Sequence, residues 1–154
     1  MNTLITREEA IHIAFSPDEM IHTQAITDAD IVEAEERFLR PIMGNSLINA
    51  IADGNYTSLR DDYVAPALAQ WSRYVAQPLH RARTIEEGDN SHNNTLANND
   101  HLRLLLRTLH RKASTLSRRL STHLNAHSDE YPEYNPNNNI LNHCSIHGDI
   151  IQIL

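Results

Sequence analysis

The side chains in this sequence best suited to metal chemistry are two sets of histidines near its C-terminal end. His123 and His127 are four residues apart, a spacing that places two imidazoles on one face of a helix. His143, Cys144 and His147 add a thiol and two more imidazoles, which are ligand types that zinc accepts. No glutamate follows His123, so the His-Glu-x-x-His pattern of zinc proteases is absent, and the other histidines are scattered. We therefore assign no metal site and no cofactor, and keep a metal-dependent role as a hypothesis for these two sets.

Nucleophilic and acid–base catalysis have less support in the sequence. Cys144 is the only cysteine, no recognisable nucleophile motif surrounds it, and one thiol cannot form an intrachain disulfide. The adjacent carboxylates Asp61-Asp62 and Glu86-Glu87 would point in different directions and do not suggest paired acid and base. There is no glycine-rich phosphate loop or dinucleotide fingerprint. We predict that the protein is not an enzyme and assign no catalytic residues.

Charge is distributed along the chain in three blocks. Residues 1–62 have a net charge of −8, residues 63–128 of +5, and residues 129–154 of −4. Opposed electrostatic fields of this kind steer encounters and fix the register of partners. The distribution is typical of a protein that stacks against copies of itself or against a charged partner.

The basic residues gather on one helix predicted from about Asp100 to Ala126. Leucines and alanines from Leu102 to Leu124 recur at helical spacing and form its buried stripe. The opposite side carries the candidate interface residues Arg103, Arg107, Arg111, Lys112, Arg118 and Arg119. Three interpretations remain open: nucleic-acid binding, a solvated helix face, and pairing with the acidic first third within or between subunits.

The elements that position these residues are predicted to be helices. Capping sequences predict helices after Thr6 and Thr27, and Pro41 is expected to end or kink the second near Leu39. Further helices are expected over 45–53 and 62–83, the latter with Leu79 in its apolar stripe, and a long polar loop over 84–99. The sequence therefore predicts an all-α bundle of about four to five helices over residues 1–139.

Residues 140–154 are predicted to form a separate extended tail. It follows a Pro/Asn-rich segment and ends in an apolar, β-prone stretch in which Gly148-Asp149 favours a short hairpin. An exposed end of this composition is an aggregation hazard unless something covers it. We predict that it packs on its own core or adds to a neighbour. The candidate interface residues of the tail are Ile150, Ile151, Ile153 and Leu154.

Targeting and membrane segments are not expected. The first residues lack the basic start and long apolar run of a signal peptide, and no stretch approaches 18 apolar residues.

With its segments placed, the chain resembles the small all-helical head–tail connector proteins, also called head-completion or adaptor proteins, of tailed bacteriophages. The resemblance is to versions carried by phages and prophages of Bacteroidetes and extends over nearly the whole chain. The matching segments are Ile-Thr-Arg-Glu-Glu-Ala (5–10), Ile-Thr-Asp-Ala-Asp-Ile (26–31), Phe-Leu-Arg-Pro-Ile-Met-Gly (38–44), Tyr-Val-Ala-Pro-Ala-Leu-Ala (63–69), Asp-Glu-Tyr-Pro-Glu-Tyr-Asn-Pro (129–136) and Asn-Ile-Leu-Asn (139–142).

This resemblance implies a structural virion protein. Copies would form a homo-oligomeric ring, commonly a dodecamer, beneath the portal protein, extending the DNA channel and offering a docking surface to neck or tail proteins. DNA would pass without sequence-specific binding, and the ring would be assembled in the bacterial host cytoplasm and reside in the neck of the virion. Residues 140–154 and 84–99 would reach neighbouring proteins. The alternative is a small helical nucleic-acid-binding regulator that uses the basic face of the last long helix.

Overall fold

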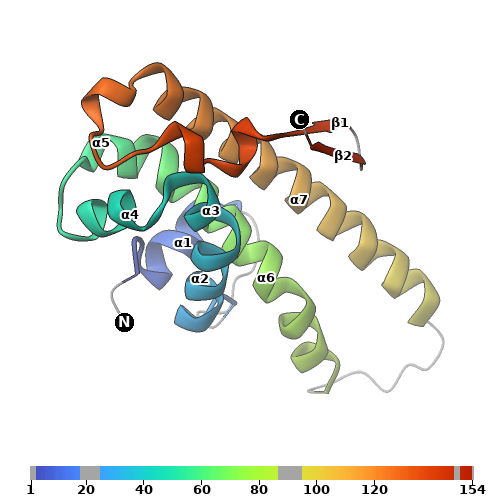
Figure 1. Ribbon diagram of the computed structural model, residues 1–154. Helices are drawn as coiled ribbons and strands as arrows, with labels where there is room; N and C mark the ends of the chain where they lie inside the picture. The colour runs from blue at the N-terminus through green and yellow to red at the C-terminus, as the bar shows by residue number, and fades with distance from the viewer. Residues whose placement is uncertain (1–2, 18–24, 87–94, 148–149, 154) are drawn as a thin grey trace.

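The computed structural model describes residues 3–17, 25–86, 95–147 and 150–153, which are built almost entirely of helices (Figure 1). The α-helices are α1 (Arg7–Ala14), α2 (Asp28–Ala34), α3 (Arg40–Met43), α4 (Asn45–Ala52), α5 (Thr57–Leu59), α6 (Ala65–Glu86) and α7 (Thr95–Ala126). The π-helical segments are η1 (Glu35–Leu39) and η2 (Arg60–Val64), and the 3₁₀ turns are η3 (Ser128–Glu130), η4 (Pro136–Asn138) and η5 (Ile140–Asn142). The strands are β1 (Cys144–His147) and β2 (Ile150–Ile153). Because the π segments join the helices beside them, the described residues form five helical rods, and the predicted all-α fold class is confirmed.

The first two rods begin at the predicted capping sequences. The Thr6 hydroxyl accepts a hydrogen bond from the Glu9 amide at 3.2 Å, and the Glu9 carboxylate accepts one from the Thr6 amide at 2.7 Å. Thr27 and Asp30 make the same reciprocal pair at 3.3 and 2.8 Å. These contacts satisfy amides that have no partner inside the helix, so the caps fix where α1 and α2 start.

Of the two effects predicted for Pro41, an end or a kink of the helix near Leu39, the end does not occur. The second rod continues through η1 into α3, and the last wide hydrogen bond runs from the Arg40 amide to the Glu35 carbonyl, directly before the proline. The same arrangement recurs before Pro66, where the Ala65 amide donates to the Arg60 carbonyl at the end of η2. Proline has no backbone N–H to donate, and in an α-helix its ring collides with the carbonyl of the residue four positions earlier. A π turn widens the backbone at that point, so each rod passes its proline without breaking.

The core lies around α6, which packs against α1, α2 and α7 (Figure 1). Trp71 is buried, stacks on Phe38 with ring centroids 3.7 Å apart, and donates from Nε1 to the Ser117 hydroxyl at 2.9 Å. Leu120 and Leu124 of α7 are fully buried against this layer, as their position in the predicted stripe requires. The fold therefore holds α7 by one face and leaves the opposite face to solvent.

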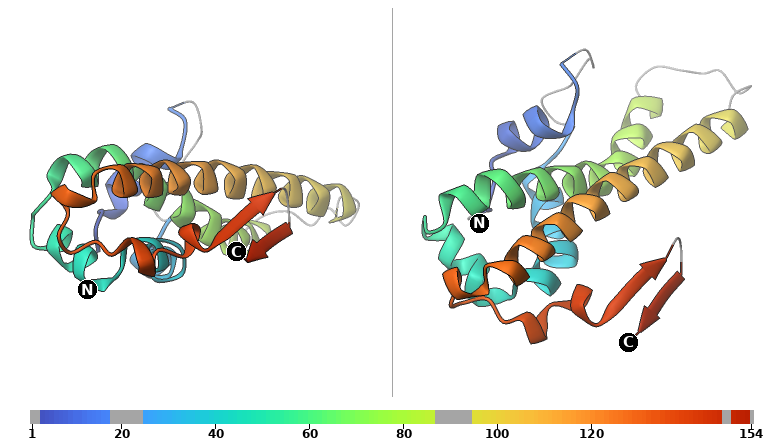
Figure 2. Two further views of the ribbon diagram at one scale, coloured as in Figure 1. Left: turned by 45° about the horizontal axis from the view of Figure 1, so that its top comes forward. Right: turned by 90° about the horizontal axis from the view of Figure 1, so that it is seen from above.

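The rods α6 and α7 are longer than predicted. Residues 84–86 are helical, as are 95–99, so the predicted polar loop over 84–99 is shortened at both ends, and residues 87–94 lie outside the described part. The joined α5, η2 and α6 also begin earlier, at Thr57. Leu79 was expected in the buried stripe of α6 but is 57% exposed. It lies in the part of α6 that extends beyond α1–α5 together with the first half of α7 (Figures 1 and 2).

The segment after α7 is anchored rather than extended. Tyr131, Tyr134 and Asn139 are buried, and the Asn139 amide donates to the hydroxyls of Ser121 at 2.8 Å and Tyr134 at 2.7 Å. The Tyr134 hydroxyl in turn donates to the Asn125 side chain at 2.6 Å. These contacts fasten residues 128–142 to the end of α7, a role that their Pro/Asn-rich composition did not reveal.

The predicted hairpin is present at the end of the chain. β1 and β2 pair antiparallel, with Cys144 opposite Ile153 and His147 opposite Ile150. The tail predicted as extended over 140–154 is therefore a 3₁₀ turn followed by a hairpin, and Gly148-Asp149 and Leu154 lie outside the described residues. The main contacts of β1 are with β2 and η5, and the hairpin stands away from α7 (Figure 2, right).

Candidate interaction surfaces

The first half of α7 presents an exposed basic surface. The first half of α7 extends beyond α1–α5 (Figure 2), and four cations are exposed between there and the middle of the helix. Leu104, which is 62% exposed, lies three residues before one arginine and seven before another, so it shares their side of the helix. We name this surface the basic arm: Arg103, Leu104, Arg107, Arg111 and Lys112.

The other two predicted basic residues lie further along α7. Arg118 and Arg119 are both exposed, and the Arg119 guanidinium lies 4.7 Å from the centroid of the Tyr63 ring. A cation over an aromatic face is attracted by the ring quadrupole. Of the six predicted residues, Arg119 therefore contacts η2, and Arg103, Arg107, Arg111 and Lys112 lie earlier on α7.

Exposed carboxylates gather around the opposite end of α7. η2 packs against α7, and η3 follows it directly, so both bring acidic residues to this end. Asp62 and Glu130 both act electrostatically on His123, which places the two segments around one histidine. We name this surface the acidic end: Asp61, Asp62, Asp129 and Glu130, all exposed.

Arginines of the acidic first third pair with carboxylates of the same third. Arg7 bonds Asp28 at 2.6 Å and joins α1 to α2, and Arg60 bonds Glu9 at 2.8 Å and also Asp61 at 2.6 Å. The Arg60 guanidinium and the cap at Thr6 lower the pKa of Glu9, so this carboxylate stays ionised at neutral pH. In the described part of this third, the ion pairs join residues of the third to each other and do not involve the basic arm.

Glu35 is a buried carboxylate inside the first π segment. Its side chain accepts from the Leu4 amide at 3.4 Å and lies 3.5 Å from the Arg40 guanidinium. Burial raises its pKa, and these two partners only partly offset that effect. The contact ties the chain before α1 to η1, which is a structural role.

His123 lies at the centre of an aromatic column beside the acidic end. Its ring stacks between Tyr63 at 4.1 Å and His127 at 4.3 Å, and its Nε2 lies 3.1 Å from the Tyr131 hydroxyl. Burial lowers the pKa of His123, and His127 and Arg119 lower it further, while Glu130 and Asp62 raise it. The predicted spacing does bring the two histidines to one face, but their rings stack on each other.

The metal hypothesis gains no candidate site from the described residues. No group of three or more His, Cys, Asp or Glu side chains comes together within them in a way that could hold an ion. His143 Nε2 lies 2.7 Å from the Asn137 carbonyl, and Cys144 and His147 form the ends of β1.

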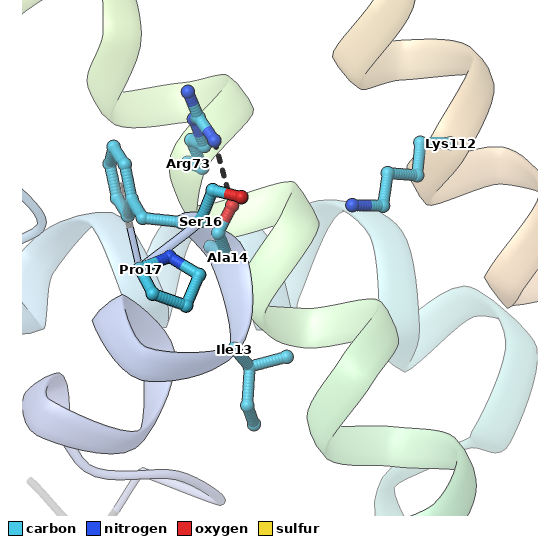
Figure 3. Close-up of a pocket in the computed structure, with 7 residues that line it drawn as sticks. Ile13, Ala14, Ser16, Pro17, Arg73 and Lys112 are labelled. Carbon is cyan, nitrogen blue, oxygen red and sulfur yellow. Dashed lines mark hydrogen bonds between the residues drawn. The ribbon is translucent and has the colours of Figure 1, made fainter. Parts of the chain in front are cut away.

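A depression of about 320 Å³ lies where the end of α1 meets α6 and α7 (Figure 3). Arg73 donates to the Ala14 carbonyl at 2.7 Å, and its guanidinium lies 4.1 Å from the Phe15 ring centroid. Lys112 approaches the same space from α7. Arg73 caps the last turn of α1. The depression is lined by residues of α1, α6 and α7, and Arg73 and Lys112 place positive charge beside the basic arm.

The predicted tail residues Ile150, Ile151 and Ile153 form β2, the last strand of the hairpin. A two-stranded sheet has one unpaired edge on each strand, and in isolation it is marginally stable. The sequence prediction missed the side chains that hold the chain leading to this hairpin, Tyr131, Tyr134 and Asn139. Their only signal was the presence of aromatics in a Pro/Asn-rich segment, where most residues stay exposed.

Fold and surfaces together define an all-α protein with a basic arm and an acidic end along α7. Its C-terminal segment is fastened to α7 and leads to a terminal hairpin. None of the helices in the described part of the chain combines the length and the hydropathy that a membrane span requires.

The family model described as a family of unknown function, DUF6712, matches residues 35–143, more than two thirds of the chain, and the protein belongs to this family. The match begins at the first residue of η1 and ends directly before β1. No curated protein and no solved structure matches the chain.

Proposed function

We propose that this protein is a structural adaptor of the phage neck, which assembles with copies of itself into a ring beneath the portal protein. The observation that carries the proposal is the separation of charge on the surface, with the basic arm and the acidic end both exposed on one small helical molecule. Charged surfaces that remain open on a folded subunit favour association with complementary partners. The resemblance to head–tail connectors supports the same class of function.

The terminal hairpin supports the docking part of this role. It stands away from the helices and offers strand edges to which another chain can add. In the proposed ring it would contact a neighbouring copy, the portal or the next neck or tail component. The ring would extend the DNA channel without reading its sequence.

The test is to purify the protein with the portal protein encoded in the same genome and to image the mixture by electron microscopy. A ring of this protein on the portal is the expected result. A protein that stays monomeric both alone and with that portal would contradict the proposal. Adjacent genes for portal, capsid and tail proteins would support it independently.

A second candidate, a small nucleic-acid-binding regulator, is favoured by one observation. Arg103, Arg107 and Arg111 project on one side of α7, and no carboxylate occurs between His101 and Ser128. Binding of this kind would weaken steeply with salt because phosphate contacts release counterions. Binding to duplex DNA at low salt that disappears when the three arginines become Gln would support this function, and no binding at low salt would remove it.

A further inference from the structure

The basic arm and the acidic end cannot neutralise each other within one molecule. They lie at different places along α7, because the helix rises about 35 Å from Arg103 to Ala126 and about 21 Å from Lys112 to Ala126. Interactions between exposed charges are largely screened beyond about 8–10 Å at physiological salt. The two surfaces therefore remain available to other molecules at the same time.

The basic arm has the composition of a protein-binding surface as well as its charge. The exposed side chain of Leu104 lies among Arg103, Arg107 and Arg111, so an apolar group is surrounded by planar cations. Arginine is enriched at interfaces because its guanidinium binds carboxylates in a bidentate geometry.

The acidic end offers the complementary chemistry on the same chain. Its four carboxylates are exposed on η2 and η3, and Asp61 among them already pairs with Arg60 at 2.6 Å. The nearby Glu133 is held by a hydrogen bond from the Tyr56 hydroxyl at 2.7 Å. The clasp formed by Tyr131, Tyr134 and Asn139 fixes η3 against α7, so these carboxylates sit on an ordered surface. A rigid acidic surface is the partner that the basic arm fits.

We infer that the basic arm of one copy docks on the acidic end of a second copy, head to tail. This inference rests on the proposed function and deepens it, because it names the two surfaces that form the joint between subunits. A joint that uses different surfaces on its two sides generates a ring when the rotation closes. A row of subunits that has not closed into a ring would have a free basic arm at one end and a free acidic end at the other, both open to other partners.

A charge-swap experiment tests the joint. The first variant replaces Arg103, Arg107 and Arg111 by Glu, and the second replaces Asp62, Asp129 and Glu130 by Lys. The matched control replaces the three arginines by Lys, which preserves their charge. Circular dichroism first establishes that each variant is folded, and analytical ultracentrifugation then measures association, with the portal added if the unaltered protein associates only on the portal.

The expected result is that each swapped variant loses association by at least about tenfold in dissociation constant, because three attractions become repulsions. The lysine control keeps the charge but not the bidentate geometry, so it loses less association than either swapped variant. The mixture of the two swapped variants recovers it, because each variant then meets a complementary surface.

Three results would overturn the inference. The first is that the arginine-to-glutamate variant associates normally. The second is that the mixture of the two swapped variants does not recover association. The third is that the arginine-to-glutamate variant loses binding to duplex DNA and shows no other defect. In each of these cases the unaltered protein still associates, so the proposed function survives. Failure of the unaltered protein to associate, alone and with its portal, is instead the failure of the proposed function.

Discussion

Asn139 holds the C-terminal segment to the helices through all of its side-chain groups. Its amide nitrogen donates to Ser121 and Tyr134, and its oxygen accepts from the Leu141 amide at 2.9 Å. The residue has no solvent exposure, so water cannot replace these contacts. Its importance could not be read from the sequence, where it is one asparagine among many in residues 135–142.

We predict that Asn139→Ala lowers the free energy of unfolding by about 1–3 kcal/mol, because buried polar groups lose their partners. Asn138→Ala is the control, since Asn138 is exposed, and its effect should stay within about 0.5 kcal/mol. Urea unfolding followed by circular dichroism measures both. Equal effects of the two substitutions would show that the buried network does not stabilise the segment.

The stacked His123 makes stability depend on pH. Because its pKa in the folded protein lies below the ordinary 6.5, the unfolded chain binds a proton over a pH range in which the folded chain does not. Stability is therefore fully present above pH 6.5 and is lost as the pH falls through the lowered pKa of the folded state. We expect His123→Gln to flatten this part of the melting-temperature profile.

His101→Gln is the matched control for that experiment, because His101 is an exposed histidine near the other end of α7. Its profile should keep the acid-side slope of the unaltered protein. A profile that is flat in the unaltered protein, or equally steep in the His123 variant, would contradict the prediction.

At the level of elements, the sequence predicted helix starts better than helix continuity. Starts depend on residues within one turn, such as Thr6 with Glu9, and the structure confirms them. Gly54 also follows the end of α4 with a φ of 92°, a backbone conformation that glycine adopts without strain. The helices continue past Pro41 and Pro66 because each contains a π turn, whose energetic cost is offset by tertiary packing. Rules based on residues close in sequence do not include that packing.

The terminal hairpin is an element joined to the body mainly through η5. We predict that removing residues 150–154 leaves the melting temperature of the isolated subunit nearly unchanged and strongly impairs assembly with copies or portal. A control replaces Ile150, Ile151 and Ile153 by Thr, which keeps the β propensity but removes the apolar side chains. It shows whether the strand itself or its apolar side chains are needed for assembly. A large loss of subunit stability with normal assembly would instead make the hairpin part of the core.

On the scale of the whole molecule, the charge blocks of the sequence become two surfaces at different places along α7. The sign of each block and the helix that bears the basic residues could be predicted from the order of the residues. The distance in space between the basic arm and the acidic end could not be predicted. The acidic end combines η2 with η3, which are far apart in sequence and are brought together by packing against α7.

We predict that self-association weakens as salt is raised from 50 to 500 mM, since screening shortens the reach of exposed charges. Sedimentation at several salt concentrations measures the dependence. The lysine control described above should show a similar slope, and the arginine-to-glutamate variant should lose it. Association that is insensitive to salt would point to an apolar joint.

The paired π turns and prolines have a consequence for how the family can change. Each wide turn accommodates one more residue than an α-helical turn, and each stands directly before a proline. Losing the extra residue alone would drive the proline ring into a carbonyl, and losing the proline alone would leave a wide turn with no ring to accommodate. We therefore expect a single-residue deletion near position 37 or 62 to be tolerated only in relatives that have also replaced the proline that follows.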